Sequence, residues 1–159
     1  MTEPLQLRPV YPFEKESLWA LLQEYLAELS SYYGDSADDQ GLFPYPYFED
    51  YFSQPSRRVY FLMHKNLAVG FALLNQYSPL GRTVDWAMAE FYIKPTHRRQ
   101  GLARQAASLL FRTHPGRWEL KFSRENTAAR RFWFSVTGDF LPELVPLSGQ
   151  EEALAFTTT

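Results

Sequence analysis

Apolar and polar residues alternate most regularly between residues 84 and 93, with a repeat of two. This repeat is typical of a β-strand, and it groups Trp86, Met88, Glu90 and Tyr92 on one face. Pro95 should end the strand, because proline has no N–H group for the ladder. Apolar residues then recur at helical spacing from Leu102 onward. The pattern therefore predicts a strand, a short turn and a helix.

The same pattern predicts the other elements. Strands are expected at residues 5–10, 57–64, 67–77 and 118–122, with a last strand within residues 150–157. A long amphipathic helix is expected at residues 14–31, a short one near Tyr47, and another after Asn126, which suits a helix cap. Gly70, inside a strand, predicts a bulge or a close backbone approach.

The turn between the central strand and its helix is basic and contains a glycine. Arg98, Arg99 and Arg104 flank Gly101 and the small Ala103. The first N–H groups of a helix lack intrahelical partners and lie at the positive end of its dipole, so this turn suits an anion such as a phosphate. It carries neither the nucleotide-binding loop ending in Gly-Lys-Ser/Thr nor the three-glycine dinucleotide pattern. The alternative is an ordinary connection with solvated arginines.

These residues resemble the signature of the GCN5-related N-acetyltransferases (GNAT), Arg/Gln-x-x-Gly-x-Gly/Ala. The match is Arg98-x-x-Gly101-x-Ala103, preceded by the apolar approach from Phe91 to Pro95. The resemblance implies that the turn holds the pyrophosphate of acetyl-CoA and that the strand binds the pantetheine arm. The residues it assigns to this contact are Phe91, Tyr92, Ile93, Arg98, Arg99, Gln100, Gly101, Leu102, Ala103 and Arg104.

A second match lies downstream, in the family pattern Asn-x-x-Ala-x-x-Phe/Leu-Tyr. Asn126, Ala129 and Phe132 occupy the matching positions, and the resemblance implies that they and Trp133 also contact the cofactor. Trp133 stands where the family has a tyrosine that protonates the leaving thiolate. An indole cannot deliver a proton as a phenol does. Tyr92 or a water could replace it, or the thiolate could leave unprotonated.

The resemblance implies an α+β fold with a mixed, mostly antiparallel sheet. We expect six to seven strands, splayed between the fourth and the fifth, and about four helices, in a single acetyltransferase domain spanning residues 1–159. Trp118-Glu119 and Phe132-Trp133 resemble a branch of predicted acetyltransferases.

Composition limits the classes of function and partner that the sequence allows. The 159 residues are 45% hydrophobic and carry a net charge of −2, which does not suggest a nucleic-acid or membrane partner. There is no cysteine, so a thiol nucleophile is excluded, and three scattered histidines do not suggest a metal site. No signal peptide or membrane span is recognisable, and we expect a cytoplasmic protein. The sequence leaves a homodimer open.

The segment from Asp35 to Gln54 is acidic and aromatic, with no basic residue. In the resembling family this region forms one wall of the acceptor site, and carboxylates with aromatic faces suit a cationic amine. The alternative is a solvated acidic loop whose aromatic residues fold onto the core.

Glu90 is the one carboxylate within the central strand, and we expect it to be the general base, with Tyr92 as the second catalytic candidate. Alternatively, Glu90 pairs with an arginine on the sheet face. Three functions follow. They are an acetyl-CoA-dependent N-acetyltransferase acting on a small primary amine by direct attack, an acyl-CoA-binding sensor or interaction module, and a domain that binds another phosphorylated ligand.

Overall fold

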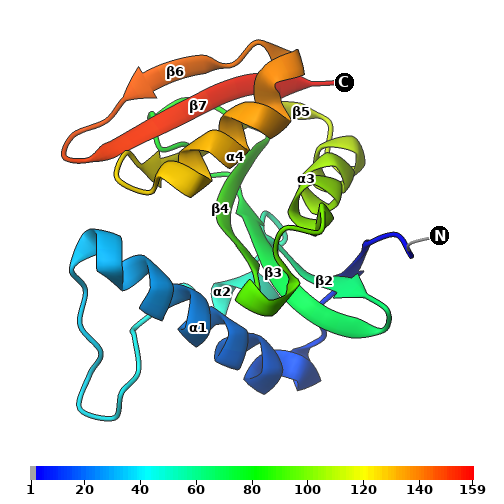
Figure 1. Ribbon diagram of the computed structural model, residues 1–159, viewed down its shortest axis with the longest axis vertical. Helices are drawn as coiled ribbons and strands as arrows, with labels where there is room; N and C mark the ends of the chain where they lie inside the picture. The colour runs from blue at the N-terminus through cyan, green and yellow to red at the C-terminus, as the bar shows by residue number, and fades with distance from the viewer. Residues whose placement is uncertain (1–2) are drawn as a thin grey trace.

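The computed structural model describes residues 3–159, which form a seven-stranded sheet with helices on both faces (Figure 1). The strand order is β1-β2-β3-β4-β5-β7-β6. The strands are β1 (Gln6–Pro9), β2 (Arg58–His64), β3 (Leu67–Asn75), β4 (Trp86–Ile93), β5 (Gly116–Ser123), β6 (Glu143–Pro146) and β7 (Glu151–Thr158). The helices are α1 (Lys15–Tyr33), α2 (Asp50–Ser53), α3 (Leu102–Thr113) and α4 (Thr127–Thr137). The expected mixed, mostly antiparallel fold is confirmed.

Strands β4 and β5 are the parallel pair of this sheet, and they part after a short shared stretch. Their pairing covers Trp86, Ala87 and Met88 on β4, opposite Trp118, Glu119 and Leu120 on β5. Beyond Met88, β4 stays paired with β3, and β5 stays paired with β7 up to Ser123. The expected splay between the fourth and fifth strands is thus confirmed.

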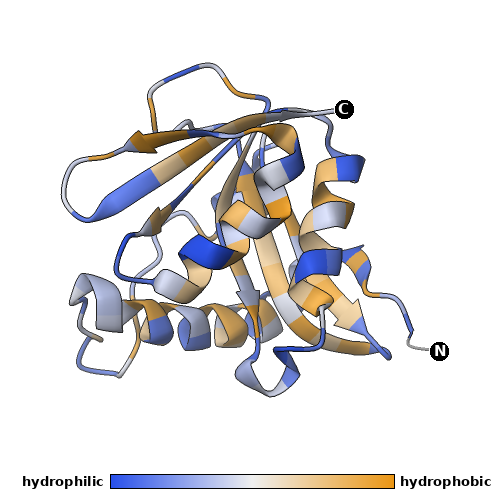
Figure 2. Cartoon of the chain, turned by 45° about the horizontal axis from the view of Figure 1, so that its top comes forward, coloured by the Kyte–Doolittle hydropathy of each residue, from blue (hydrophilic) through white to orange (hydrophobic). Residues whose placement is uncertain are grey.

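Each face of the sheet has its own hydrophobic core. On one face α1 and α2 pack Leu18, Leu22 and Tyr51 against β2, β3 and β4. On the other face α3 and α4 pack Leu110 and Trp133 against strands from both halves of the sheet. Figure 2 shows the central strands largely in hydrophobic colours, while apolar and polar residues alternate along α1. Burial of these apolar surfaces holds α1 and α2 on one face of the sheet and α3 and α4 on the other.

A bulge in β4 corrects the simple alternation expected from the sequence. Leu73 pairs with Glu90 and Leu74 with Met88, so Ala89 is an extra residue on β4. A bulge of this kind shifts the following side chains to the other face. Met88 therefore packs in the core under α3 and α4, whereas Glu90 points toward α1.

Two glycines have the roles expected from the sequence, and one strand was not expected. Gly34, with φ of 73°, ends α1 in the left-handed conformation that glycine adopts without strain. A Cβ on Gly70 would lie 1.9 Å from the carbonyl oxygen of Tyr92, which is the predicted close approach. Strand β6 was not foreseen, because four residues that end in proline carry little periodicity. Within residues 3–159, no helix combines the length and apolarity that crossing a membrane requires.

Candidate active site

The parting of β4 and β5 opens a cleft of about 650 Å³ between the two halves of the sheet. The unpaired end of β4 lines it on one side, with α1, and β5 and α4 line it on the other. From Ala89 to Ile93, β4 has no strand partner on its β5 side. Backbone N–H and C=O groups on that side are therefore free to pair with an extended ligand.

One end of the cleft is formed by the basic turn before α3. Arg99 has φ of 62° and Gly101 has φ of 78°, so both residues are left-handed, and Gly101 caps the helix without a side-chain hydrogen bond. The first backbone bond of the helix runs from the Gln105 N–H to the Gly101 carbonyl. The N–H groups of the preceding residues are thus left for an anion.

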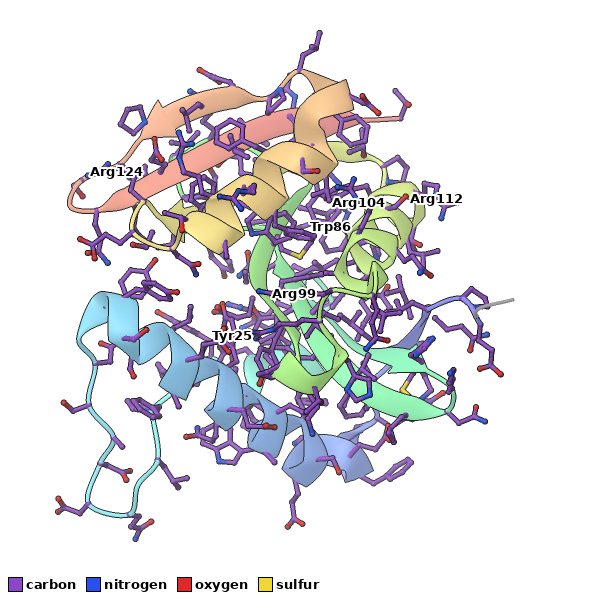
Figure 3. The ribbon with its side chains drawn as sticks, viewed as in Figure 1. Tyr25, Trp86, Arg99, Arg104, Arg112 and Arg124 are labelled. Atoms are coloured by element: carbon purple, nitrogen blue, oxygen red, sulfur yellow. The ribbon has the colours of Figure 1, made fainter. Side chains whose placement is uncertain are left out.

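The three arginines of this turn have different surroundings. Arg98 donates from Nε to the Ile93 carbonyl oxygen and from its guanidinium to Glu28 on α1, each at 2.8 Å. Arg104 donates to the Ser135 hydroxyl on α4. Arg99 makes no side-chain hydrogen bond or ion pair within residues 3–159, and it is not among the residues that line the cleft, although Figure 3 labels it near the turn before α3. Arg98 therefore ties the turn to β4 and α1, while Arg99 carries an exposed charge.

The residues expected on α4 line the same cleft as Arg98 and Ala103, whereas the other predicted turn residues lie outside its lining. Asn126, Ala129, Phe132 and Trp133 all line it. The Asn126 side chain accepts a hydrogen bond from the Ala129 N–H at 3.1 Å, and so caps α4 as predicted. Trp133 is buried, and its ring packs edge-on against Phe91, with centroids 5.1 Å apart. The indole thus forms part of the wall opposite β4.

Glu90 lies deeper in the cleft, and two phenols hold its carboxylate. Tyr25 on α1 donates to Oε1 and Tyr45 donates to Oε2, each at 2.8 Å. Burial raises the pKa of Glu90 above its usual range, while the two hydrogen bonds and the charge of Lys121 act in the opposite direction. The expected alternative of an arginine partner is not found within residues 3–159, where no ion pair involves Glu90.

Tyr92 shares the α1 face of β4 with Glu90. It is buried beside Tyr25 and Phe71, and the Arg98 guanidinium lies 5.6 Å from its ring centroid. Burial raises the pKa of Tyr92 to about 12, so the phenol keeps its proton throughout the physiological range. Tyr92 also lines the cleft.

The far end of the cleft is bridged between α1 and β7. Tyr33 donates to Glu151 at 3.0 Å, and Gln150 donates to the Tyr32 carbonyl oxygen at 2.6 Å. Lys121 on β5 lies 3.4 Å from the other Glu151 oxygen. Burial raises the pKa of Tyr33, and the hydrogen bond to Glu151 and the negative charge of Glu151 raise it further. The bridge is therefore held by a neutral phenol. The two halves of the splayed sheet are therefore linked beside Glu90.

Part of the acidic and aromatic segment is a solvated loop, and part of it reaches the candidate site. Its carboxylates at Asp35, Asp38 and Asp39 are exposed, and Asp38 accepts hydrogen bonds from nearby backbone N–H groups, as a solvated loop would. Tyr45, by contrast, reaches Glu90, and Phe48 is buried under α1. The segment thus contributes one phenol to the site and leaves the charges of Asp35, Asp38 and Asp39 in solvent.

Sequence reasoning did not assign Tyr25, Tyr33, Lys121 or Glu151 to the site, and it included Tyr45 only as part of the acidic and aromatic segment. The sequence contained one weak indication of Tyr25. A tyrosine within a leucine stripe needs a partner for its hydroxyl once it is buried, and Tyr25 interrupts such a stripe. Only the bulge at Ala89 reveals that this partner is Glu90. Within residues 3–159, no cluster of three or more potential metal ligands occurs.

Comparison with known proteins identifies the class. The model of the acetyltransferase (GNAT) family matches residues 18–135, which is most of the chain and includes the turn and most of α4. The chain therefore belongs to the GNAT acetyltransferase family. A search of curated proteins gave no match.

Solved structures share the fold along the whole chain. An acetyltransferase from Thermus thermophilus is 22% identical, with a TM-score of 0.68 and 99% of each chain covered. The PaiA N-acetyltransferase from Thermoplasma acidophilum, solved with coenzyme A, is 11% identical, with a TM-score of 0.64, 98% of this chain covered and 99% of that one. Diaminobutyrate acetyltransferase EctA from Paenibacillus lautus, solved with L-2,4-diaminobutyric acid and coenzyme A, is 17% identical, with a TM-score of 0.59, 99% of this chain covered and 96% of that one.

Proposed function

We propose that the protein is an acetyl-CoA-dependent N-acetyltransferase that acetylates a primary amine of a small molecule by direct attack in a ternary complex. One observation carries the proposal. A single cleft joins a helix N-terminus with free N–H groups to a carboxylate held by two phenols. The first feature suits a pyrophosphate and the second suits proton abstraction from an amine. Residues 1–159 would act as one catalytic domain.

The cleft has features that fit acetyl-CoA. In the proposal, Arg99, Arg104 and the N–H groups of residues 101–104 hold the pyrophosphate, and Arg98 and Gln100 support the turn. The pantetheine arm pairs with the free edge of β4 along Phe91 and Ile93, as an added strand would. Asn126, Ala129, Phe132 and Trp133 form the opposite wall. Two neighbours in fold were solved with coenzyme A, which supports a CoA thioester as the ligand of this cleft.

Glu90 is the proposed base. The amine nitrogen attacks the thioester carbonyl, its proton passes to Glu90 directly or through one water, and the carbon–sulfur bond breaks to release CoA. A carboxylate whose pKa is raised by burial accepts this proton better near neutrality. Tyr92 is the proposed hydrogen-bond donor to the leaving sulfur, because its phenol stays protonated and lines the cleft, and the released thiolate then takes its proton from solvent.

The charges along the cleft are consistent with an amine acceptor. Glu28 is paired with Arg98, and Glu151 with Lys121, so their charges largely cancel. Glu90 remains as a carboxylate without an ion-pair partner within residues 3–159. The cleft is thus biased toward a neutral or cationic acceptor, and the substrate amine of the EctA neighbour is of this kind.

A second function has a specific observation in its favour. Trp133 occupies the position of the usual phenolic acid and is buried against Phe91, where its indole can wall off the thioester without protonating it. This favours a catalytically weak acyl-CoA sensor or interaction module as the alternative.

Calorimetric titration tests both readings. Acetyl-CoA, dephospho-CoA and NAD are titrated separately, and micromolar binding of acetyl-CoA in preference to NAD is expected. A panel of amines is then screened for thiol release at saturating acetyl-CoA. Binding with thiol release supports the transferase, and binding without release for any amine supports the sensor. Absence of acetyl-CoA binding contradicts both.

A further inference from the structure

One of the two hydrogen bonds to the Glu90 carboxylate comes from a residue outside the sheet and outside the regular helices. Tyr45 belongs to residues 34–49, a segment without helix or strand, yet its hydroxyl donates to Glu90 Oε2 at 2.8 Å. Tyr25, the donor to Oε1, lies on α1 and is held in the core by Phe71 and Tyr92. The carboxylate is therefore held by one donor on a rigid helix and by one donor on an irregular segment.

The segment is docked through a few specific contacts. Gln23 on α1 pairs with the backbone of Phe43, donating to its carbonyl at 2.8 Å and accepting from its N–H at 2.7 Å. Two residues later, Tyr45 reaches Glu90. Asn75 on β3 donates to the Tyr51 hydroxyl at 3.2 Å, which anchors α2 after the segment. Placement of the Tyr45 hydroxyl therefore requires that the segment be docked on α1 and β4.

We propose that Tyr45 is a positioning residue for Glu90, so that the carboxylate is held for proton abstraction only while segment 34–49 is docked. This inference rests on the proposed function, in which Glu90 is the base. A carboxylate that accepts one hydrogen bond at each oxygen is fixed in its orientation. The lone pairs that accept no hydrogen bond then also have a fixed direction. Without Tyr45, only the Tyr25 hydrogen bond orients it.

The proposal predicts a change in the protonation of Glu90. The groups that face it are Tyr25 and Tyr33 from α1, Tyr45 from the segment, Tyr51 from α2 and Lys121 from β5. Hydrogen bonds to the ionised form lower the pKa of a carboxylate, and burial raises it. Loss of the Tyr45 hydroxyl removes a lowering contribution and leaves the burial, so the pKa of Glu90 should rise.

The test compares Tyr45→Phe with Tyr47→Phe. Tyr47 is exposed, lies on the same segment and makes no side-chain hydrogen bond in the described part of the chain, so its variant is a matched control. The acidic limb of the kcat/KM profile is expected to move up by about one pH unit in Tyr45→Phe and to stay in place in Tyr47→Phe. Acetyl-CoA affinity should be unchanged in both variants, which checks that each has folded.

A readout without turnover separates this inference from the proposed function. In protein labelled with ¹³C-glutamate at the carboxyl carbon, the signal that disappears in Glu90→Gln reports Glu90. Its titration midpoint should rise in Tyr45→Phe relative to Tyr47→Phe. Equal midpoints and superimposed pH profiles in the two variants overturn the positioning role, even if the enzyme is active. A shifted midpoint in a protein that acetylates no amine overturns the proposed function, and the catalytic meaning of Tyr45 with it.

Discussion

Introduction of a negative charge into the basic turn is the sharpest test of the cofactor site. The change is Gly101→Glu, and the matched control is Gly101→Gln, which has nearly the same shape and no charge. Gly101 has φ of 78°, and no atom lies within 4 Å of a Cβ built there. The Cβ of either variant therefore has room, and both carry the same left-handed backbone strain.

The two effects can be estimated separately. A left-handed residue with a Cβ costs about 1–2 kcal/mol, so both variants should melt about 3–6 °C lower than the parent. A carboxylate about 5 Å from a phosphate charge is repelled by about 1 kcal/mol in water-like surroundings and by about 3 kcal/mol near a protein surface. With two phosphate charges and the exposure of Gly101, we expect about 2–3 kcal/mol, or roughly 30- to 150-fold weaker binding of Gly101→Glu than of Gly101→Gln.

The assay is calorimetric titration with dephospho-CoA, which keeps the pyrophosphate and lacks the 3′-phosphate. The difference between the two variants should shrink in high salt, because the Debye length falls from about 10 Å at 0.1 M to about 3 Å at 1 M. Equal affinity of the two variants and the parent would place the pyrophosphate away from the turn. Equal loss in both variants would refute the electrostatic argument and leave backbone geometry as the cause.

Substitutions at three further positions test the site and the sheet. Glu90→Gln should slow turnover by about 100-fold or more and remove the acidic limb of the pH profile, and an unaltered profile would contradict its role as base. Because burial raises the folded-state pKa of Glu90, its ionisation opposes folding above that pKa, so the same variant should melt higher at pH 7 and lose this advantage below about pH 4.5. Trp133→Tyr should raise kcat by about tenfold or more over Trp133→Phe if proton delivery to sulfur limits the rate, and equal rates would exclude that limit. Gly70→Ala places a Cβ against the Tyr92 carbonyl and should cost about 3 kcal/mol or more of unfolding free energy in urea titration, whereas an unchanged midpoint would show that β3 and β4 can separate freely.

The central elements could be predicted because their signals are local. Alternation marked β4, Pro95 marked its end, and apolar residues at helical spacing from Leu102 marked the start of α3. Asn126 was recognisable as a cap, because a cap depends only on the next few residues. These signals also carried the family resemblance, since the turn and α4 are continuous pieces of sequence.

The arrangement around Glu90 could not be predicted from the sequence, because it depends on contacts between distant segments. Tyr25 and Tyr45 lie 65 and 45 residues from Glu90 along the chain, and only packing of α1 and the irregular segment on the sheet brings them to its carboxylate. The bulge at Ala89 decides which face Glu90 occupies, and a single extra residue leaves no periodic trace. The sequence by itself thus determined the elements and the turn. The tertiary structure decided the surroundings of the base, since desolvation and hydrogen bonding are properties of the packed chain.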